Sequence, residues 1–471
     1  MKILLVQPPP PPDWVGFRRT ALPEPLAMEC IGAVAVDHHD VRLIDMRLGD
    51  SLEETLDAFE PDAVAVTCLT TEVYNAQDIL QRVRSRQPQT LTLVGGHHAS
   101  LLPVDFQQPY VDAIVVGEGE RTLEALLAAI DRSDGRPSEA ALAAIDGLMW
   151  QQTDGKWVEN AERSLMPSLN NLPLPARHLA AHHKDEYFFL FDQPHACIAT
   201  SRGCPYRCNF CSVWKFYHKR CRYMSAERVV DELQSVEPTA VSFVDDNFLS
   251  HVPRAWKILE LIRERRIEKT YGIQARTDTI SKNPDLIAAW KDVGLETILI
   301  GFEGATQEQL DAVAKGATIE QNERAMEVLN DLGVHMWGAF IVDPQCTAED
   351  FDALKRYREE KGIIYPQFTV LTPLPGTDLY EQRESELVTR DYRLFDALHA
   401  VLPTRLPREE FYQHFASLYR PDNMDLAYEL ISSGRITMER ARKAHEILTE
   451  LGDYRNFLKG EETVGSPAAT S

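Results

Sequence analysis

The chain has 471 residues, which is enough for about three domains of ordinary size. Its 49 basic and 72 acidic residues give a formal net charge of −23, which argues against nucleic acid as a general partner. Eight cysteines in a chain of this length do not make a disulfide scaffold, and no apolar run approaches the roughly 18 residues of a membrane span. We therefore expect a soluble protein of a reducing cytoplasm.

Residues 1–135 alternate short apolar segments with helical ones, the pattern of a parallel sheet. The predicted strands are 2–6, 41–45, 63–67, 91–94 and 113–116, and the predicted helices lie near 26–36, 51–59, 72–86 and 120–131. This order predicts a doubly wound α/β domain, which binds ligands at the carboxyl ends of its strands.

Polar residues and glycines gather at those predicted strand ends. They are Gln7, Thr67, Leu69, Thr70, Thr71, Gly95, Gly96, His97, Gly117, Glu118 and Gly119. Glycines at such positions let a large ligand approach the backbone closely. The chain lacks both G-x-G-x-x-G after the first strand and G-x4-G-K-[ST], so a dinucleotide site or a P-loop has no motif to support it.

Residues 136–193 are predicted to form a connector with a hairpin at Asp154-Gly155 and a turn-rich linker at 170–175. Strands and helices alternate again over 194–379. The strands are expected at 195–200, 240–245, 270–276, 296–302, 334–342 and 366–371. Six such units make a partial (β/α)6 barrel, with its site at the carboxyl ends of the strands. Residues 380–458 read as a helical cap, and 459–471 as a disordered tail.

Three cysteines, Cys204, Cys208 and Cys211, follow the first barrel strand with C-x3-C-x2-C spacing. Three thiolates on one loop hold three irons of a [4Fe–4S] cluster and leave the fourth iron open to a ligand. A structural zinc site with Cys221 as fourth ligand is the alternative, although zinc sites favour two separated pairs. A disulfide is weaker still, because cysteines on one tight loop pair badly.

With Phe210 before its last cysteine, this motif resembles the radical S-adenosylmethionine (SAM) enzymes. The run 95–98 (GGHH) and the run 116–120 (VGEGE), in a domain that precedes the motif, resemble the cobalamin-binding domain of the B12-dependent radical SAM class. The resemblance covers residues 1 to about 380. It implies three cofactors: a [4Fe–4S] cluster, SAM and cobalamin.

Many cobalamin domains carry the motif D-x-H-x-x-G, whose histidine ligates cobalt from below. This sequence departs from that motif. The nearest match, Asp37-His38-His39, has Arg42 in place of glycine and precedes a strand. His97 has no such aspartate either. We therefore expect cobalamin without a protein histidine on cobalt, and His97 as a polar loop residue near the corrin.

The radical SAM resemblance also implies a SAM site at the barrel strand ends. Asp245 or Asp246 would face the SAM ammonium, although two acids after a strand also cap turns. Gln274 and Arg276 share one face of the third strand by the period of two, and Arg276 is a plausible partner of the SAM carboxylate.

The next two strands complete that implied site. Glu303 suits the ribose hydroxyls, and the glycines that flank it, Gly301 and Gly304, leave room for the nucleoside. Gly338 and Ile341 offer small and apolar contacts suited to adenine.

A basic run without acids surrounds the cysteines. It contains Arg202, Arg207, Lys215, Lys219, Arg220 and Arg222. We interpret it as an electropositive collar that favours a reduced cluster and docks a small acidic electron donor of the flavodoxin or ferredoxin type. A solvated basic loop is the alternative.

The resemblance implies methyl transfer. Cobalamin takes a methyl group from one SAM, a second SAM yields the 5′-deoxyadenosyl radical, and the substrate radical captures the methyl group. Residues 395–412 resemble enzymes that act on large apolar lipids or tetrapyrroles, such as hopanoid C-3 methylases and the anaerobic cyclase of bacteriochlorophyll synthesis. We favour a hopanoid-like substrate, with peripheral contact to membrane lipid; a tetrapyrrole cyclase and a non-catalytic B12 and Fe–S sensor are the alternatives.

A large apolar substrate needs a channel, and five side chains are candidates for its lining. They are Trp14, Phe17, Phe395, His399 and Leu402. Ordinary packing is the alternative interpretation of all five.

Overall fold

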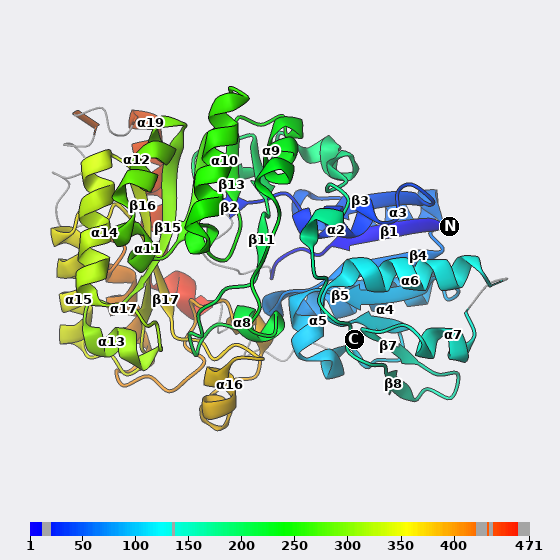
Figure 1. Cartoon of the computed structure of the whole chain (residues 1–471). Coiled ribbons are helices and arrows are strands. Elements are labelled where there is room, and N and C mark those ends of the chain that lie inside the picture. The colour runs from blue at the N-terminus through cyan, green and yellow to red at the C-terminus, as the bar shows by residue number, and fades with distance from the viewer. Residues whose placement is uncertain (12–19, 134–136, 421–430, 433–436, 460–471) are drawn as a thin grey trace. The chain divides into compact units, whose positions relative to one another are not determined.

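The computed structural model describes residues 1–11, 20–133, 137–420, 431–432 and 437–459, which divide into two compact units (Figure 1). Unit 1 comprises the described residues of Met1–Pro12, Glu24–Pro167 and Asn171–Lys184. Unit 2 comprises those of Asp13–Pro23, Ser168–Asn170 and Asp185–Ser471. Apart from Lys459, the tail predicted to be disordered lies outside the described residues.

Unit 1 is built on a seven-stranded sheet in the order β3-β1-β4-β5-β6-β7-β8. The strands are β1 (Lys2–Gln7), β3 (Asp40–Asp45), β4 (Ala63–Thr67), β5 (Leu91–Gly95), β6 (Ala113–Val115), β7 (Leu148–Gln151) and β8 (Trp157–Glu159). The main helices are α2 (Leu26–Ala33), α3 (Leu52–Phe59), α4 (Val73–Arg86) and α6 (Gly119–Asp131). The first five strands are parallel, so the predicted doubly wound domain is confirmed.

The central strand β1 shows why this sheet forms. Its four apolar residues Ile3–Val6 are fully buried, and β3 and β4 pair with it on either side. A continuous apolar run is what a strand needs when helices cover both faces of a parallel sheet.

The hairpin predicted at Asp154-Gly155 is present and belongs to unit 1. Gly155 has φ +84°, and strands β7 and β8 pair antiparallel on either side of it. Strand β7 also pairs antiparallel with β6, and Trp150 is buried there. Within the predicted connector 136–193, the described residues up to Pro167 complete the sheet of unit 1, and those from Asp185 belong to unit 2.

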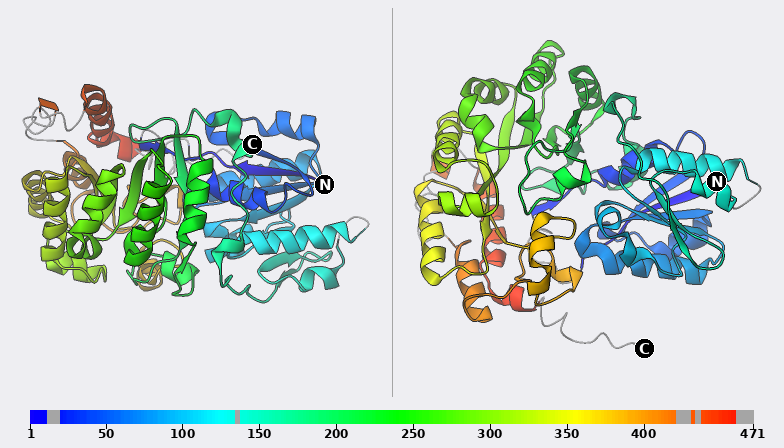
Figure 2. Two further views of the ribbon diagram at one scale, coloured as in Figure 1. Left: turned by 45° about the horizontal axis from the view of Figure 1, so that its top comes forward. Right: turned by 60° about the horizontal axis from the view of Figure 1, so that its bottom comes forward.

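Unit 2 contains the partial barrel, six strands in the order of the chain. They are β10 (His195–Ile198), β13 (Ala240–Phe243), β14 (Thr270–Ala275), β15 (Leu295–Glu303), β16 (His335–Val342) and β17 (Tyr365–Val370). All neighbours are parallel, so the carboxyl ends meet at one edge. The helices between them stand side by side along the outer face of the sheet (Figure 2).

Aromatic packing and helix caps fix these units locally. On the outer face, Trp290 of α12 (Pro284–Asp292) is fully buried, 6.0 Å between ring centroids from Phe243 and 5.3 Å from Phe248. Thr306 and Thr347 both form capping boxes, at the starts of α13 (Gln307–Ala312) and α15 (Ala348–Glu360).

One described stretch of the predicted helical cap is not α-helical. Residues 384–407 contain only short 3₁₀ turns, between α16 (Asp378–Arg383) and α17 (Arg408–Ser417), and α19 (Met438–Leu451) follows later in the chain. Helix α19 is tied to the amino end of the barrel, because Arg440 bonds Glu296 at 3.1 Å and Asp192 at 3.0 Å.

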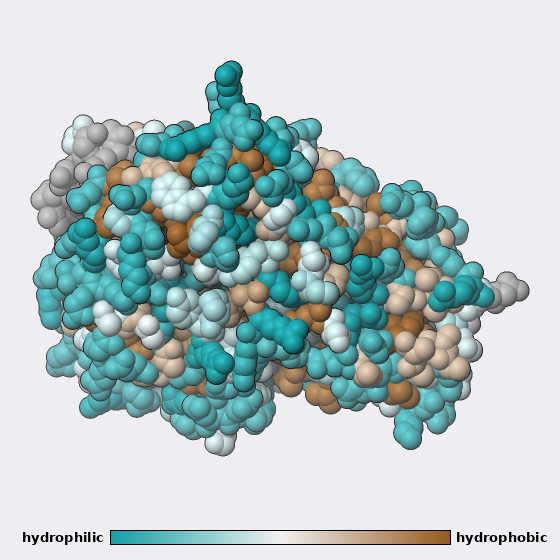
Figure 3. Space-filling model, in the orientation of Figure 1, coloured by the Kyte–Doolittle hydropathy of each residue, from teal (hydrophilic) through white to brown (hydrophobic). Residues whose placement is uncertain are grey.

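Among the described helices, none is long and apolar enough to cross a membrane. The face of the molecule drawn in Figure 3 is mainly hydrophilic, with hydrophobic residues in small groups, which agrees with a chain that is 26% charged.

Candidate active site

The three cysteines lie on the loop between β11 (Ser201–Arg202) and α8 (Val213–Phe216). Gly203 precedes them with φ +93°, and a Cβ atom there would lie 2.2 Å from the carbonyl oxygen of Arg220. Only glycine fits both constraints. The thiol of Cys221 donates to the carbonyl oxygen of Gly203 at 3.0 Å, which ties the two ends of the loop together.

Asp245 fixes the backbone that leads into this loop. The N–H groups of Thr200 and Ser201 both donate to one carboxylate oxygen at 2.6 Å, and the Thr200 hydroxyl donates to the other. The Arg254 guanidinium donates to the carbonyl oxygens of Thr200 and Met224, each at 2.8 Å. Burial raises the pKa of Asp245, and the hydrogen bonds from Thr200 and the charge of Arg254 oppose that rise. Asp245 thus holds the loop and is 1% exposed, and its predicted role toward the SAM ammonium stays a prediction.

Asp246, the second of the two acids, bonds the cysteine loop itself. Its Oδ2 accepts the N–H of Gly203 at 3.2 Å, directly beside the first cysteine. Surrounding protein raises its pKa to about 6 although the residue is exposed to solvent, and the charge of Asp245 adds to that rise. A cation beside this carboxylate would favour its ionised form.

Arg276 brings positive charge to the cysteines. Its Nη1 lies 4.0 Å from Sγ of Cys208, and its guanidinium carbon lies 3.6 Å from the centre of the Tyr206 ring. The same guanidinium donates to Asp278 at 3.0 Å and to the carbonyl oxygen of Lys315 at 2.7 Å. This inward arginine is therefore paired within the protein, and its place beside Cys208 was not part of the sequence prediction.

Burial affects the acidity of the predicted cluster thiols. It raises the pKa of Cys204 and raises that of Cys211 to about 12, so iron would displace protons on binding.

Glu303 forms a buried ion pair that the sequence analysis missed. Lys315 Nζ lies 2.6 Å from Glu303 Oε1, and each side chain is less than a tenth exposed. Glu303 has φ +63° at an irregularity in the β15–β16 register. A Cβ atom on Gly301 would lie 2.1 Å from Glu303 Oε1, so this glycine makes room for the carboxylate. Lys315 follows a short helix with no periodicity to mark it, and only the fold brings it to Glu303.

The expected adenine contacts divide between the two faces of β16. A Cβ atom on Gly338 would meet the Phe302 ring at 2.9 Å, so the protein itself fills the space beside this glycine, and its adenine contact stays a prediction. Ile341 lies on the opposite face by the period of two. Ile341 and Phe210 pack on one small cluster of Val313, Leu371 and Leu379, so the structure brings these two predicted residues together. Gln274 is half-buried on the strand that leads to Arg276.

At the carboxyl edge of the unit 1 sheet, the glycines serve two different purposes. Gly117 has φ +82° and open space where a Cβ would lie, and its N–H donates to the Ser100 hydroxyl at 3.0 Å. Gly96 has φ +96°, and a Cβ there would meet Thr67 Oγ1 at 2.7 Å. The close approach at Gly96 is therefore by the protein itself, whereas Gly117 leaves space for a ligand.

The loop after β4 presents an apolar residue to solvent. Leu69 is 55% exposed, and Thr70 and Thr71 follow it in η2 (Thr70–Glu72). The buried Glu72, which the sequence analysis missed, accepts the N–H of Leu69 at 2.9 Å, and burial raises its pKa to about 7. Its other oxygen lies 3.5 Å from the amide of Gln7. Gly95, Glu118 and Gly119 lie half-buried at the carboxyl edge of the same sheet.

The two histidines after β5 differ in their surroundings. His98 is fully buried between the Thr70 hydroxyl, at 3.2 Å, and the Asp105 carboxylate, at 2.9 Å. His97 begins α5 (His97–Leu101), and burial lowers its pKa to about 4. His97 is thus neutral at physiological pH, and its place near the corrin stays a prediction.

The structure places the expected channel residues of the cap in its interior. Phe395 is 3% exposed and packs with Leu394 and Val401. His399 is 2% exposed, with Nδ1 2.9 Å from Asp396 and Nε2 3.0 Å from the carbonyl oxygen of Phe457. These contacts agree with the packing interpretation, and fully buried Leu402 does too. Trp14 and Phe17 lie outside the described residues.

An apolar cavity of about 60 Å³ lies within unit 2, against the amino-terminal half of the barrel and α19. Its lining includes Phe191, Trp337, Tyr365, Ala444 and Leu448.

The loop geometry makes Gly203→Ala a sharp test. We expect this variant to lose most of its cluster iron, because the new Cβ would meet a backbone oxygen at 2.2 Å in a left-handed conformation. The matched control is Gly155→Ala, since Gly155 has a similar φ of +84° but nothing within 4 Å of the added atom. Iron and sulfide per chain after anaerobic reconstitution are the measurement. Full cluster content in Gly203→Ala would show that the loop does not depend on this glycine.

Models of two protein families match the chain. The B12 binding domain matches residues 15–127, and the radical SAM superfamily matches residues 198–358. These ranges cover the carboxyl edge of the unit 1 sheet and the cysteine loop described above.

Two curated relatives align along most of the chain. The hopanoid C-3 methylase of Methylococcus capsulatus is 32% identical over 88% of this chain and 78% of its own length. The anaerobic magnesium-protoporphyrin IX monomethyl ester cyclase of Rubrivivax gelatinosus is 28% identical over 89% of this chain and 74% of its own.

Solved structures share the fold. The radical SAM methyltransferase TsrM from Kitasatospora setae, with cobalamin and a [4Fe–4S] cluster bound, has a TM-score of 0.68 at 17% identity, over 96% of this chain and 99% of that one. The cobalamin-dependent SAM radical enzyme OxsB, with aqua-cobalamin and SAM bound, has a TM-score of 0.68 at 17% identity, over 98% of this chain and 78% of that one. The chain therefore belongs to the B12-dependent radical SAM methyltransferase family, whose cofactors are a [4Fe–4S] cluster, SAM and cobalamin.

Proposed function

We propose that the protein methylates an unactivated carbon of a large apolar polycycle of the hopanoid type. The observation that carries this proposal is the alignment with the hopanoid C-3 methylase, which extends over 88% of the chain and so includes both units. The bound cofactors supply the radical and the methyl group, and the protein has to hold and align them.

The residues of unit 2 take distinct parts in this proposal. Cys204, Cys208 and Cys211 hold the cluster, and Arg276 supplies positive charge beside Cys208. Asp246, next to the cysteine loop, receives the SAM ammonium. Glu303, in its ion pair with Lys315, turns toward the ribose hydroxyls, and Gln274 adds a polar group at the same edge.

An acidic electron donor of the flavodoxin or ferredoxin type is the proposed partner of the basic run. Arg207, Lys219 and Arg220 are exposed in the structure. Lys215 is neutralised, because its ammonium lies 2.6 Å from Asp378 and 2.7 Å from Glu381. The exposed positive charge for docking therefore rests on the other members of the run.

A radical SAM cyclase acting on a tetrapyrrole is the second candidate. Its support is the alignment with the Rubrivivax gelatinosus cyclase over 89% of the chain. A non-catalytic sensor has less support, since a sensor would not need the charged side chains of Asp246, Arg276 and Glu303 at the carboxyl edge of the barrel.

The mass of the product separates the two reactions. With protein reconstituted anaerobically with iron, sulfide and cobalamin, we expect a hopanoid substrate to gain about 14 Da for each methyl group transferred, because one hydrogen is replaced by CH₃. Mass spectrometry of hopanoid and magnesium-protoporphyrin monomethyl ester reactions is the measurement. Oxygen insertion with ring closure in the tetrapyrrole, and an unmodified hopanoid, would contradict the proposal and favour the cyclase.

Alanine at Cys204, Cys208 or Cys211 is expected to abolish SAM cleavage and the thiolate–iron absorbance at roughly 400 nm, because three thiolates hold the cluster. Cys221→Ala is the matched control and should keep both, since its thiol bonds Gly203. Absorbance and 5′-deoxyadenosine formation measure the two properties. SAM cleavage at the wild-type rate in Cys208→Ala would refute the cluster assignment, and loss of the cluster in Cys221→Ala would restore a four-cysteine site.

A further inference from the structure

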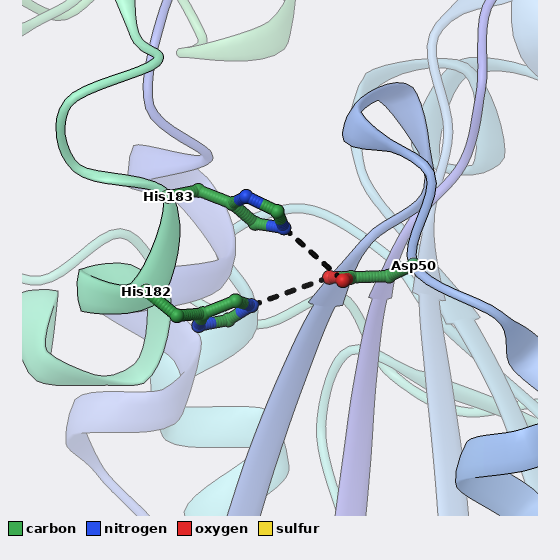
Figure 4. Close-up of side chains that lie close together, drawn as sticks. All are labelled: Asp50, His182 and His183. Carbon is green, nitrogen blue, oxygen red and sulfur yellow. Dashed lines mark hydrogen bonds and ion pairs between the residues drawn. The ribbon is translucent and has the colours of Figure 1, made fainter.

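Unit 1 contains a cluster of two imidazoles and one carboxylate that the methyltransferase reaction does not use. Asp50 follows η1 (Met46–Leu48), and His182 and His183 end η5 (Arg177–His183). The Nε2 atom of His182 lies 3.3 Å from Asp50 Oδ2, and that of His183 lies 3.1 Å from Oδ1. Figure 4 shows both rings reaching the carboxylate from one side.

The carboxylate is held in place by the fold. The backbone N–H of Asp45, at the end of β3, donates to Asp50 Oδ2 at 2.8 Å. Asp45 is itself fully buried and pairs with Arg47. This is the outer support that ligating carboxylates receive in metal sites.

The two imidazoles stand close enough to share one ion. Their ring centroids are 4.2 Å apart, and each ring reaches the same carboxylate. A single divalent ion would therefore satisfy all three side chains at once.

We propose that Asp50, His182 and His183 bind a divalent transition-metal ion of the Zn²⁺ class. Zinc binds imidazole nitrogen at about 2.0–2.1 Å and carboxylate oxygen at about 2.0–2.2 Å, so neighbouring ligand atoms of a tetrahedral site are separated by about 3.4 Å. The observed 3.1 and 3.3 Å are close to that spacing, and all three ligand atoms lie within 4.8 Å of one another.

The ligand set also selects the class of metal. Two imidazoles disfavour Ca²⁺ and Mg²⁺, which prefer oxygen ligands, and favour zinc and its neighbours. The His182 side chain is 49% exposed while His183 is 11% exposed, so the ion can enter from solvent on the His182 side and keep a position there for water. The ion would join the end of η5 to the loop after η1. His183 lies two residues before Asp185, where the chain enters unit 2.

X-ray absorption at the zinc edge tests this site in the full chain with its cluster and cobalamin in place, because iron and cobalt absorb at other edges. With one equivalent of Zn²⁺ added, we expect nitrogen and oxygen neighbours at about 2.0 Å with imidazole scattering. A sulfur shell at about 2.3 Å would place the zinc on cysteines and overturn the proposal.

Zinc titration of variants identifies the ligands. His182→Ala, His183→Ala and Asp50→Asn should each weaken Zn²⁺ binding at least about 100-fold, since loss of an outer-shell partner alone costs 10–100-fold. The matched control is His178→Ala, on the exposed part of the same helix, which should bind Zn²⁺ as tightly as the wild type. Asp50→Asn keeps the shape of the side chain, so it guards against misfolding. Failure of the wild type to bind stoichiometric Zn²⁺, or unchanged affinity in all three variants, would refute the site.

Discussion

The buried carboxylate of Asp245 is the group on which the cysteine loop depends. It accepts both N–H groups at Thr200 and Ser201 together with the Thr200 hydroxyl, while Arg254 bonds the Thr200 carbonyl oxygen from the other side. These bonds fix the direction in which the chain leaves β10 and therefore where the first cysteine stands. A metal cluster with an open iron needs this rigidity, because its protein ligands come from one short loop.

Paired charges recur along the carboxyl edge of the barrel. Arg276 with Asp278 lies after β14, and Lys315 bonds Glu303 at the end of β15. Such buried pairs contribute little to net stability, since desolvation offsets their attraction, whereas loss of one partner is costly. Their value here is that a charged cofactor meets preorganised groups of both signs.

The sequence predicted the elements well because their signals are local. Apolar runs such as Ile3–Val6 and caps such as Thr306 with Gln309 are set by near neighbours, and the observed strands start within one residue of the predicted ones. The cysteine motif could be recognised from its spacing alone. Residues 384–407 were predicted as helix from composition, but they pack through turns.

The roles that the sequence missed depend on tertiary contacts. Gly338 faces the Phe302 ring, and Gly96 faces the Thr67 side chain. The partner of each glycine comes from another strand or loop, so the local sequence does not reveal it. His399 is held by Asp396 and by the distant carbonyl of Phe457, which no local pattern reveals. Lys315 and the Asp50 cluster were missed for the same reason.

Iron content of an Asp245→Asn variant tests most directly the central claim that this carboxylate positions the cluster loop. The amide has one acceptor oxygen, so one of its present donors must lose its partner inside the protein, at a cost of about 1–3 kcal/mol. We predict that the variant keeps its three cysteines yet retains well under half of the wild-type iron after anaerobic reconstitution, whereas Asp231→Asn, on the exposed side of α9 (Ala226–Ser235), retains all of it. Wild-type iron content and absorbance in Asp245→Asn would contradict the account.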